Sequence, residues 1–182
     1  MDIFLVRHGE AATRWGESAD PGLSELGQQQ AADLAHQLQP SLQAHVQLIS
    51  SPLQRAKETA MPLARLLRQD VSEDEAFREI PSPVPLAQRQ QWLRRFMQQQ
   101  WSEQGAELQA WRARTLHQLL GLREPAVIFT HFLVINAVVG QLLNRPQTLC
   151  FSPDNGSVTH LRHTGSSLEL VALGREMATA VN

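Results

Sequence analysis

The sequence has very little cysteine, and this excludes several kinds of protein. Cys150 is the only cysteine among 182 residues. No disulfide can therefore form within one chain, and no cysteine-rich metal site can be built. A lone cysteine is more often a small buried apolar side chain than a nucleophile, so we expect no catalytic role for Cys150.

Long apolar runs and an excess of positive charge are also absent. No segment approaches the roughly 20 apolar residues that span a bilayer, and the first apolar run is too short for a signal peptide and lacks its basic lead. The formal net charge is -2 and no long basic run occurs, which gives no general reason to expect nucleic acid as a partner. We therefore expect a soluble, cytoplasmic protein that binds neither nucleic acid nor a membrane.

Short apolar runs and helical periodicity alternate along the chain. Strands are predicted at 3–6, 46–50, 71–77 (weakly) and 126–130, helices at 24–39, 51–67, 86–100, 105–122 and 132–143, and a terminal hairpin at 157–162 and 167–173. Pro62 is expected to kink or break its helix. This order predicts a three-layer α/β/α sandwich with a mostly parallel central sheet and an antiparallel C-terminal strand. We expect a single domain, 1–182, in which about 80–122 form an inserted helical cover.

Basic side chains follow the two best-defined strands. Arg7 and His8 come directly after the first strand, and His131 comes directly after the strand at 126–130. Ligands in an open α/β sheet bind beyond the carboxyl ends of its strands. Arg55 lies in the first turn of a predicted helix, where unpaired N–H groups favour an anion. Two guanidiniums and two imidazoles that converge in this way predict a pocket for a tetrahedral oxyanion such as phosphate.

These residues lie in sequence blocks that resemble the histidine phosphatase superfamily, the group that includes cofactor-dependent phosphoglycerate mutases. In the family's order, the blocks are Arg-His-Gly-Glu at 7–10, the first loop and helix at 20–31, Ser-Ser-Pro-Leu-Gln-Arg-Ala with Thr-Ala at 50–60, Thr-His at 130–131 and Asn-Gly-Ser-Val at 155–158. An Arg-His-Gly triplet alone would be weak evidence. Five ordered blocks that run nearly the full length of the chain are strong evidence.

The resemblance implies that His8 is a nucleophile that takes the phosphoryl group and forms a phosphohistidine. A neutral imidazole is a competent nucleophile, and adjacent cations oppose its protonation. Arg7, Arg55 and His131 would supply positive charge around the equatorial oxygens of the transferring group without a metal. Gly9 would let the backbone turn tightly beside the nucleophile. No cofactor is implied.

A proton donor is also required, because an alkoxide leaves poorly unless it is protonated. The family uses an acid after the third strand, and the best positional match here is Glu79. Glu73 and Glu75 are nearby competitors. Burial in the pocket would raise the pKa of the acid into the useful range.

The chain departs from the family pattern in three places. Many members follow the first triplet with Glu-Thr-x-Trp-Asn, whose Asn contacts phosphate, whereas this chain has Glu-Ala-Ala-Thr-Arg-Trp-Gly at 10–16. That contact is missing or is replaced by Thr13 or Arg14. Phe132 stands where the second histidine is often followed by Gly, and Pro-Ser-Pro follows Glu79 in place of the Gly and further Glu that are common there. We expect these changes to affect the hydrolytic reaction less than they affect the tight recognition of one familiar substrate.

The other polar and aromatic residues have simpler explanations. We assign structural roles to His36, His45, His117, His160 and His163. A zinc site is not favoured, because no carboxylate or Cys lies at a ligand spacing near His8 or His131. Trp92 and Trp101 are expected to pack the covering helices. Arg89, Arg94 and Arg95 either favour a second negative group on the substrate or form an exposed basic helix face.

The sequence thus predicts a metal-independent phosphomonoesterase that acts through phospho-His8 on a small phosphorylated metabolite. A phosphoglycerate mutase-type phosphoryl transfer is the first alternative, although family mutases are usually longer in the covering segment than the span 80–124. A phosphohistidine-protein phosphatase is the second, because a phosphoramidate leaves with less need of a strong acid. A non-catalytic phosphate-binding module is the third.

Overall fold

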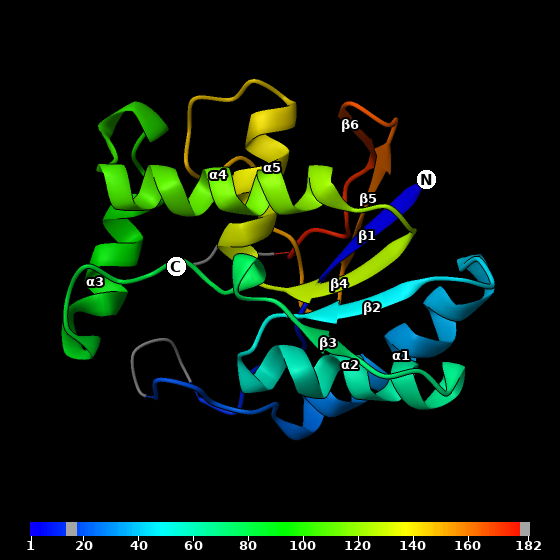
Figure 1. Ribbon diagram of the computed structural model, residues 1–182. Coiled ribbons are helices and arrows are strands. Elements are labelled where there is room, and N and C mark those ends of the chain that lie inside the picture. The colour runs from blue at the N-terminus through cyan, green and yellow to red at the C-terminus, as the bar shows by residue number, and fades with distance from the viewer. Residues whose placement is uncertain (14–17, 179–182) are drawn as a thin grey trace.

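The computed structural model describes residues 1–13 and 18–178 (Figure 1). Within them the chain forms β1 (Asp2–Arg7), α1 (Glu25–Leu38), β2 (Gln47–Ser50), α2 (Gln54–Leu67), β3 (Ser72–Glu73), α3 (Leu86–Phe96), α4 (Ala106–Gly121), β4 (Ala126–Thr130), α5 (Phe132–Leu142), β5 (Val158–His163) and β6 (Leu168–Ala172). Short 3-10 turns lie at η1 (Gln39–Ser41), η2 (Glu75–Phe77) and η3 (Trp101–Glu103). Over the described ranges, no helix is both long enough and apolar enough to cross a membrane.

The strands form one six-stranded sheet in the order β3-β2-β4-β1-β5-β6. β3, β2, β4 and β1 pair in parallel, whereas β5 is antiparallel to both β1 and β6. β5 and β6 form the predicted terminal hairpin. The predicted mostly parallel sheet with an antiparallel strand near the C-terminus is therefore confirmed.

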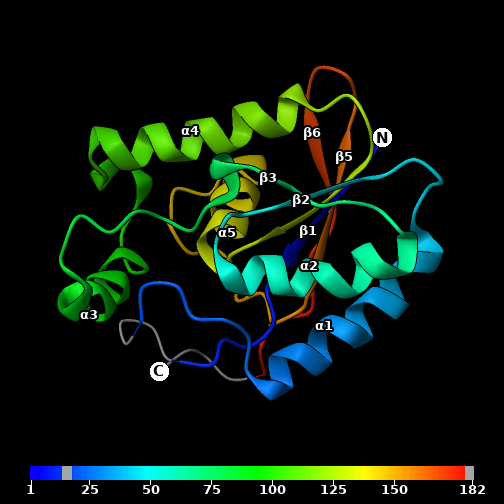
Figure 2. The ribbon, with the colours of Figure 1, turned by 60° about the horizontal axis from the view of Figure 1, so that its bottom comes forward.

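Helices cover both faces of the sheet, which gives the predicted three layers (Figures 1 and 2). Successive residues of β1 show the arrangement, because strand side chains alternate between faces. Ile3 and Leu5 pack in one apolar cluster with residues of α4 and α5, whereas Phe4 and Val6 pack in a second cluster with residues of α1 and α2. The first strand is thus buried on both faces, as its uninterrupted apolar run predicts.

A third apolar cluster joins α3, η3, α4 and α5 at one end of the molecule. It contains Phe96 from α3, Trp101 from η3, Trp111 from α4 and Leu133 from α5. Trp101 is buried, and Trp92 packs against the cluster from its edge. Both tryptophans therefore pack the covering helices, as predicted.

Two predicted elements differ locally from the structure, at three points. α2 begins at Gln54 and not at Ser51, because the Ser51 N–H continues the strand pairing by donating to the Phe129 carbonyl at 2.9 Å. The strand predicted at 71–77 is limited to two residues, since the Asp74 carboxylate accepts from the Ala76 N–H and starts η2. α2 continues through Pro62, so of the two predicted effects, a kink or a break, the break is wrong.

Candidate active site

The site lies where β1, β2 and β4 end at the same edge of the sheet. Arg7 is the last residue of β1 and His8 follows it, while Ser51 follows β2 and His131 follows β4. The His8 N–H donates to the Thr130 carbonyl at 3.0 Å, and this hydrogen bond connects the end of β1 to the end of β4. Parallel pairing therefore brings together side chains that are far apart in the sequence.

The hydrogen bonds of His8 define which ring nitrogen carries the proton. Nδ1 lies 2.7 Å from the Gly9 carbonyl oxygen, and Nε2 lies 3.0 Å from Nε of Arg55. A carbonyl only accepts and a guanidinium only donates, so Nδ1 carries the hydrogen and Nε2 presents its lone pair. Burial, with Arg55 and Arg7 nearby, holds the pKa of His8 well below its ordinary value of 6.5. His8 is thus neutral, with an unprotonated Nε2 in the pocket.

The lowered pKa of His8 has a consequence for stability that a His8→Gln variant will show. Below about pH 6.5 the unfolded chain takes up a proton on this histidine and the folded protein does not. The contribution of His8 to the free energy of unfolding is therefore fully present above that pH and is lost as the pH falls. Between pH 6 and 5, the unfolding free energy of the wild type should fall about 1 kcal/mol more than that of His8→Gln. Urea unfolding at both pH values measures this difference.

The exposed His36 provides the matched control for that comparison. His36→Gln should keep the pH dependence of the wild type. Equal pH slopes for His8→Gln and the wild type would contradict a buried, neutral His8.

Arg55 is placed by the first turn of α2, and its side chain is 9% exposed. Thr59, one helical turn further on, donates through Oγ1 to the Arg55 carbonyl at 2.7 Å and accepts from the Gly9 N–H at 3.0 Å. This hydroxyl connects the loop after His8 to the turn that carries the Arg55 guanidinium. Sequence reasoning gave Thr59 no role, although its spacing of four residues from Arg55 places it on the same helix face.

Gly9 lies where the structure leaves no room for a side chain. Its φ is not positive, so no left-handed turn occurs there. A Cβ at Gly9 would instead lie 2.5 Å from the carbonyl oxygen of Gly27 in α1. The absence of a side chain lets the loop after β1 cross the start of α1 in close contact.

Arg7 is buried, and its guanidinium is held from three sides. Nη1 donates to the Pro153 carbonyl at 2.7 Å and lies 3.5 Å from Sδ of Met177, and the guanidinium carbon lies 5.0 Å from the centre of the Phe132 ring. Burial lowers the pKa of Arg7 to about 10, although Glu79 opposes this effect, so the side chain stays charged at neutral pH. Phe132, which departs from the family pattern, thus packs directly against the Arg7 guanidinium.

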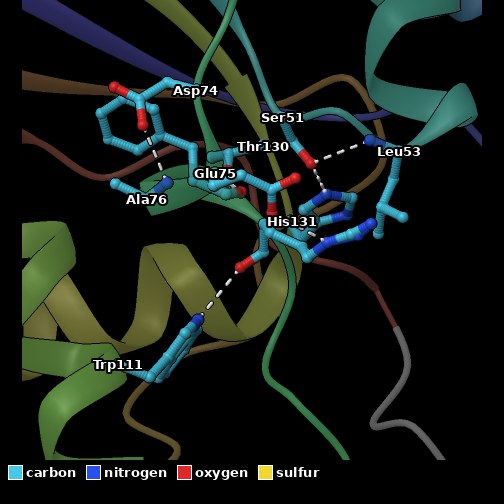
Figure 3. A network of polar contacts seen from close by, with 10 residues as sticks. Ser51, Leu53, Asp74, Glu75, Ala76, Trp111, Thr130 and His131 are labelled. Atoms are coloured by element: carbon cyan, nitrogen blue, oxygen red, sulfur yellow. Dashed lines mark hydrogen bonds and ion pairs between the residues drawn. The ribbon is translucent and has the colours of Figure 1, made fainter.

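His131 is completely buried, and its Nε2 lies within hydrogen-bonding distance of Ser51 Oγ, at 2.7 Å (Figure 3). The same hydroxyl accepts from the Leu53 N–H at 3.3 Å. The Ser51 hydroxyl hydrogen is therefore best placed toward Nε2 of His131, which then acts as the acceptor. In that arrangement the neutral His131 ring carries its own hydrogen on Nδ1, as a donor. Burial, with Arg55 and His8 nearby, keeps the pKa of His131 well below its ordinary value. The two imidazole centres are 5.2 Å apart.

Several buried polar atoms of this region have no hydrogen-bond partner among the described residues. They include Arg7 Nε, Thr13 Oγ1 and His131 Nδ1. An unpaired buried polar group costs about 1–3 kcal/mol, so such groups seldom gather without a ligand to satisfy them. A bound oxyanion would accept a hydrogen bond from each of these three groups.

Glu79 is 8% exposed, and both of its carboxyl oxygens face backbone donors. Oε1 accepts from the Ile80 N–H at 3.0 Å, and Oε2 lies 3.5 Å from the Leu133 nitrogen. Burial raises the pKa of Glu79, which Arg55 and Arg89 only partly oppose. The carboxyl group can therefore hold a proton at a higher pH than an exposed glutamate can.

Glu73 and Glu75, the competing acids, are both exposed. Glu73 pairs with Lys57 at 3.4 Å and Glu75 pairs with Arg78 at 3.2 Å, both on the surface. Neither lines the hollows described below. Of the three glutamates, Glu79 alone is in position to reach a ligand.

Three successive backbone carbonyls before Glu79 accept hydrogen bonds from side chains, and the one donated by Trp111 is seen in Figure 3. The pairs are Thr115 Oγ1 to Ala76 at 2.8 Å, Thr130 Oγ1 to Phe77 at 2.8 Å and Trp111 Nε1 to Arg78 at 3.1 Å. Two of the donors belong to α4 and the third ends β4. α4 and the end of β4 thus fix the segment that carries Glu79.

Two adjacent hollows open onto these residues. One, of about 350 Å³, is lined by Arg55 and Glu79, and the other, of about 500 Å³, is lined by Arg7 and His8. Thr13 lines both. The predicted residue Arg14 lies outside the described residues.

The site lacks the features of a metal centre. Within 1–13 and 18–178, no group of three or more His, Cys, Asp and Glu side chains is arranged to hold a metal ion. His8 and His131 instead contact a guanidinium and a hydroxyl. The chemistry that this arrangement supports is the binding and transfer of an oxyanion.

Solved structures with this fold include several phosphatases. Phosphoserine phosphatase from Entamoeba histolytica in complex with 3-phosphoglyceric acid is 22% identical, with a TM-score of 0.75 over 97% of this chain and 98% of that one. The mycobacterial glucosyl-3-phosphoglycerate phosphatase is 22% identical, with a TM-score of 0.75 over 97% and 99%. At these identities the likeness shows the fold.

Sequence comparison gives a partial match and a nearly complete one. A probable phosphoglycerate mutase GpmB from Proteus mirabilis is 35% identical over 91 residues, which cover 46% of this chain and 40% of that protein. The profile of the histidine phosphatase superfamily (branch 1) matches residues 3–176, in agreement with the resemblance of the five sequence blocks. The chain therefore belongs to the histidine phosphatase superfamily, branch 1.

Proposed function

We propose that this protein is a metal-independent phosphomonoesterase that acts through a phosphohistidine at His8 on a small phosphorylated metabolite. The observation that carries the proposal is the lone pair of His8 Nε2, which faces the Arg55 N–H inside a buried, positively charged pocket. A bound phosphate would accept that N–H in place of the imidazole. The exchange frees the lone pair of Nε2 for attack on phosphorus.

The first chemical step transfers the phosphoryl group to the enzyme. Nε2 of His8 forms a bond to phosphorus as the ester P–O bond breaks, and the departing oxygen takes the proton of Glu79. Arg7, Arg55 and the Nδ1–H of His131 stabilise the charge on the equatorial oxygens. The hydrogen bond from His8 Nδ1 to the Gly9 carbonyl stabilises the positive charge that develops on the phosphorylated ring.

The second step releases phosphate. Glu79, now a carboxylate, takes a proton from a water molecule whose oxygen attacks phosphorus, and the N–P bond breaks. The electron pair returns to Nε2, and Glu79 is again protonated for the next cycle. The cycle needs a glutamate with a raised pKa, and burial supplies that at Glu79.

The surroundings of this centre complete the proposal. Thr13 or Arg14 takes the place of the phosphate-binding Asn of other members; the buried Thr13 hydroxyl supports the first choice, and Arg14 lies outside the described residues. The chain 1–182 acts as one cytoplasmic domain, and about 80–122 form the cover over the site. Two similar folds are named as phosphatases, of phosphoserine and of glucosyl-3-phosphoglycerate, which supports hydrolysis.

A mutase is the second candidate, since the relative from Proteus mirabilis is named a probable phosphoglycerate mutase. Both reactions share the phosphohistidine and differ in the acceptor, which is water in one and a phosphorylated organic acid in the other. The short span between Glu79 and β4 favours the phosphatase.

Incubation with 3-phosphoglycerate, a 2,3-bisphosphoglycerate primer and EDTA separates the two reactions and tests the need for a metal. We expect release of inorganic phosphate at a rate within about twofold of that without EDTA, because Arg7 and Arg55 supply the positive charge that a metal would otherwise provide and His131 adds a hydrogen-bond donor. Accumulation of 2-phosphoglycerate would identify a mutase. A loss of activity that added Mg²⁺ or Zn²⁺ restores would contradict the metal-independent mechanism.

A further inference from the structure

Two short segments that pair with each other supply hydrogen-bond acceptors to Arg7. The segments 152–154 and 175–177 run antiparallel and share two backbone hydrogen bonds, of 2.7 and 2.9 Å. The first segment provides the Pro153 carbonyl and the second provides Sδ of Met177, at 2.7 and 3.5 Å from Nη1 of Arg7. The pairing of the two segments therefore sets the position of the Met177 sulfur beside the guanidinium.

Met177 also lies at the wall of the active site. It is half-buried, and it lines the hollow of about 500 Å³ together with Arg7 and His8. A peroxide molecule is smaller than the phosphate that this hollow is proposed to admit, so the sulfur is accessible to it. The other methionines do not line this hollow; they are Met1, Met61 and Met97.

We propose that Met177 is a site of oxidative modification, and that its sulfoxide takes the Arg7 guanidinium away from phosphate. The oxidant is a small peroxide such as hydrogen peroxide. A lone pair of the thioether sulfur forms a bond to one peroxide oxygen as the O–O bond breaks, and the other oxygen leaves as water with both hydrogens. The sulfur is oxidised and the peroxide is reduced. This inference rests on the proposed function, because it assumes that phosphate binds against Arg7.

Oxidation changes Met177 from a weak hydrogen-bond acceptor into a strong one. A thioether sulfur accepts weakly, whereas a sulfoxide is polar and presents an oxygen. The sulfur already lies 3.5 Å from Nη1, and the methionine side chain is unbranched and flexible, so the added oxygen can reach the guanidinium. Arg7 Nε has no hydrogen-bond partner among the described residues. The sulfoxide oxygen and a phosphate oxygen therefore compete for the same donors.

The modified side chain stays beside Arg7 because the contacts that hold its backbone do not involve the sulfur. The Met177 N–H donates to the Ser152 carbonyl at 2.9 Å, and an ion pair of 3.0 Å between Arg175 and Asp154 joins the same two segments. Met177 packs only at the edge of the third apolar cluster. A polar oxygen at this position is thus placed at the hollow and not in the middle of a core.

Phosphate binding before and after treatment with hydrogen peroxide tests the inference without turnover. Calorimetry with inorganic phosphate would measure the affinity, and mass spectrometry of peptides would locate the added oxygen. We expect oxygen on Met177 and about tenfold weaker binding, as the loss of one hydrogen bond to a charged group predicts. Methionine sulfoxide reductases of both epimer specificities, with a thiol reductant, should restore the affinity.

Two variants, each compared with its own untreated sample, identify the responsible methionine. Met177→Leu keeps the apolar bulk without the sulfur, so its affinity for phosphate should be the same before and after peroxide. Met61→Leu removes an exposed methionine on α2, and it should lose affinity on oxidation as the wild type does. Met177→Ile provides the same comparison if Met177→Leu does not fold.

Three results would overturn the inference: an equal loss of affinity in Met177→Leu, oxygen on Met177 with unchanged affinity, or no oxygen on Met177 when the other methionines are oxidised. Circular dichroism of the treated protein is the control for folding, and a loss of affinity that only accompanies unfolding would also count against it. Absence of phosphate binding before oxidation would defeat the proposed function as well. If the untreated protein binds phosphate but hydrolyses no ester, while oxidation of Met177 still weakens binding, the proposed function fails and the modification site stands.

Discussion

Replacement of His8 by alanine is expected to lower kcat on p-nitrophenyl phosphate by about 10⁴-fold or more, as loss of a covalent nucleophile does. The expectation follows from the unprotonated Nε2 in a pocket where burial and two arginines lower the pKa of the ring. His131 cannot replace His8 as the nucleophile, since its Nε2 is hydrogen-bonded to the Ser51 hydroxyl. Steady-state release of nitrophenolate measures the effect.

The variant must keep its fold and its affinity for phosphate for this result to be informative. Circular dichroism and calorimetry with inorganic phosphate provide that control, because Arg7 and Arg55 remain. Retention of more than a few per cent of the wild-type rate would show that the phosphoryl group is not transferred to His8.

Replacement of Glu79 by glutamine should reduce kcat on an alkyl phosphate by about 10²- to 10⁴-fold. Glutamine keeps the shape of the side chain but cannot supply the proton that an alkoxide needs. Nitrophenolate leaves without that proton, so the first turnover with p-nitrophenyl phosphate should be affected much less. A rapid-quench comparison of the two substrates measures the difference.

The pH profile provides a second measure of the same group. The raised pKa means that Glu79 keeps its proton to a higher pH than a free glutamate, so activity on an alkyl phosphate should fall as the pH rises through that pKa. Glu79→Gln should lose this limb of the profile. Glu75→Gln, which changes an exposed acid four residues away, should leave both rate and profile unchanged. A large loss in Glu75→Gln and none in Glu79→Gln would reassign the acid.

The strand-end residues were predictable because two simple patterns place them. An uninterrupted apolar run followed by polar residues indicates a buried strand and its end, and parallel strands end at the same edge. Arg7, His8 and His131 meet by this rule, and Arg55 joins them from the start of a helix. The order of layers followed from the same alternation of strands and helices.

The groups that support these side chains could not be predicted, because they are contacts between distant segments. Trp111 is 33 positions from the carbonyl it holds, and Met177 is 170 positions from Arg7. No local periodicity encodes such pairs. The reason for Gly9 was also hidden, since it depends on the position of Gly27 in a different element.

The short strand β3 and the late start of α2 show how local hydrogen bonds override propensity. The Asp74 carboxylate draws the chain into a 3-10 turn after two strand residues, which leads it toward Glu79. Ser51 extends the pairing of β2 by one residue and thereby reaches His131. Both departures from the predicted elements serve the site.

Trapping the covalent intermediate tests the central claim most directly. The protein would be mixed with p-nitrophenyl phosphate, quenched in base within one turnover, digested and examined by mass spectrometry. We predict an acid-labile phosphate on the peptide that contains His8, with greater occupancy in Glu79→Gln, where the hydrolysis step is slowed, and with none in His8→Ala. Rapid turnover with no phosphate on His8, or with phosphate on another residue, would contradict the mechanism.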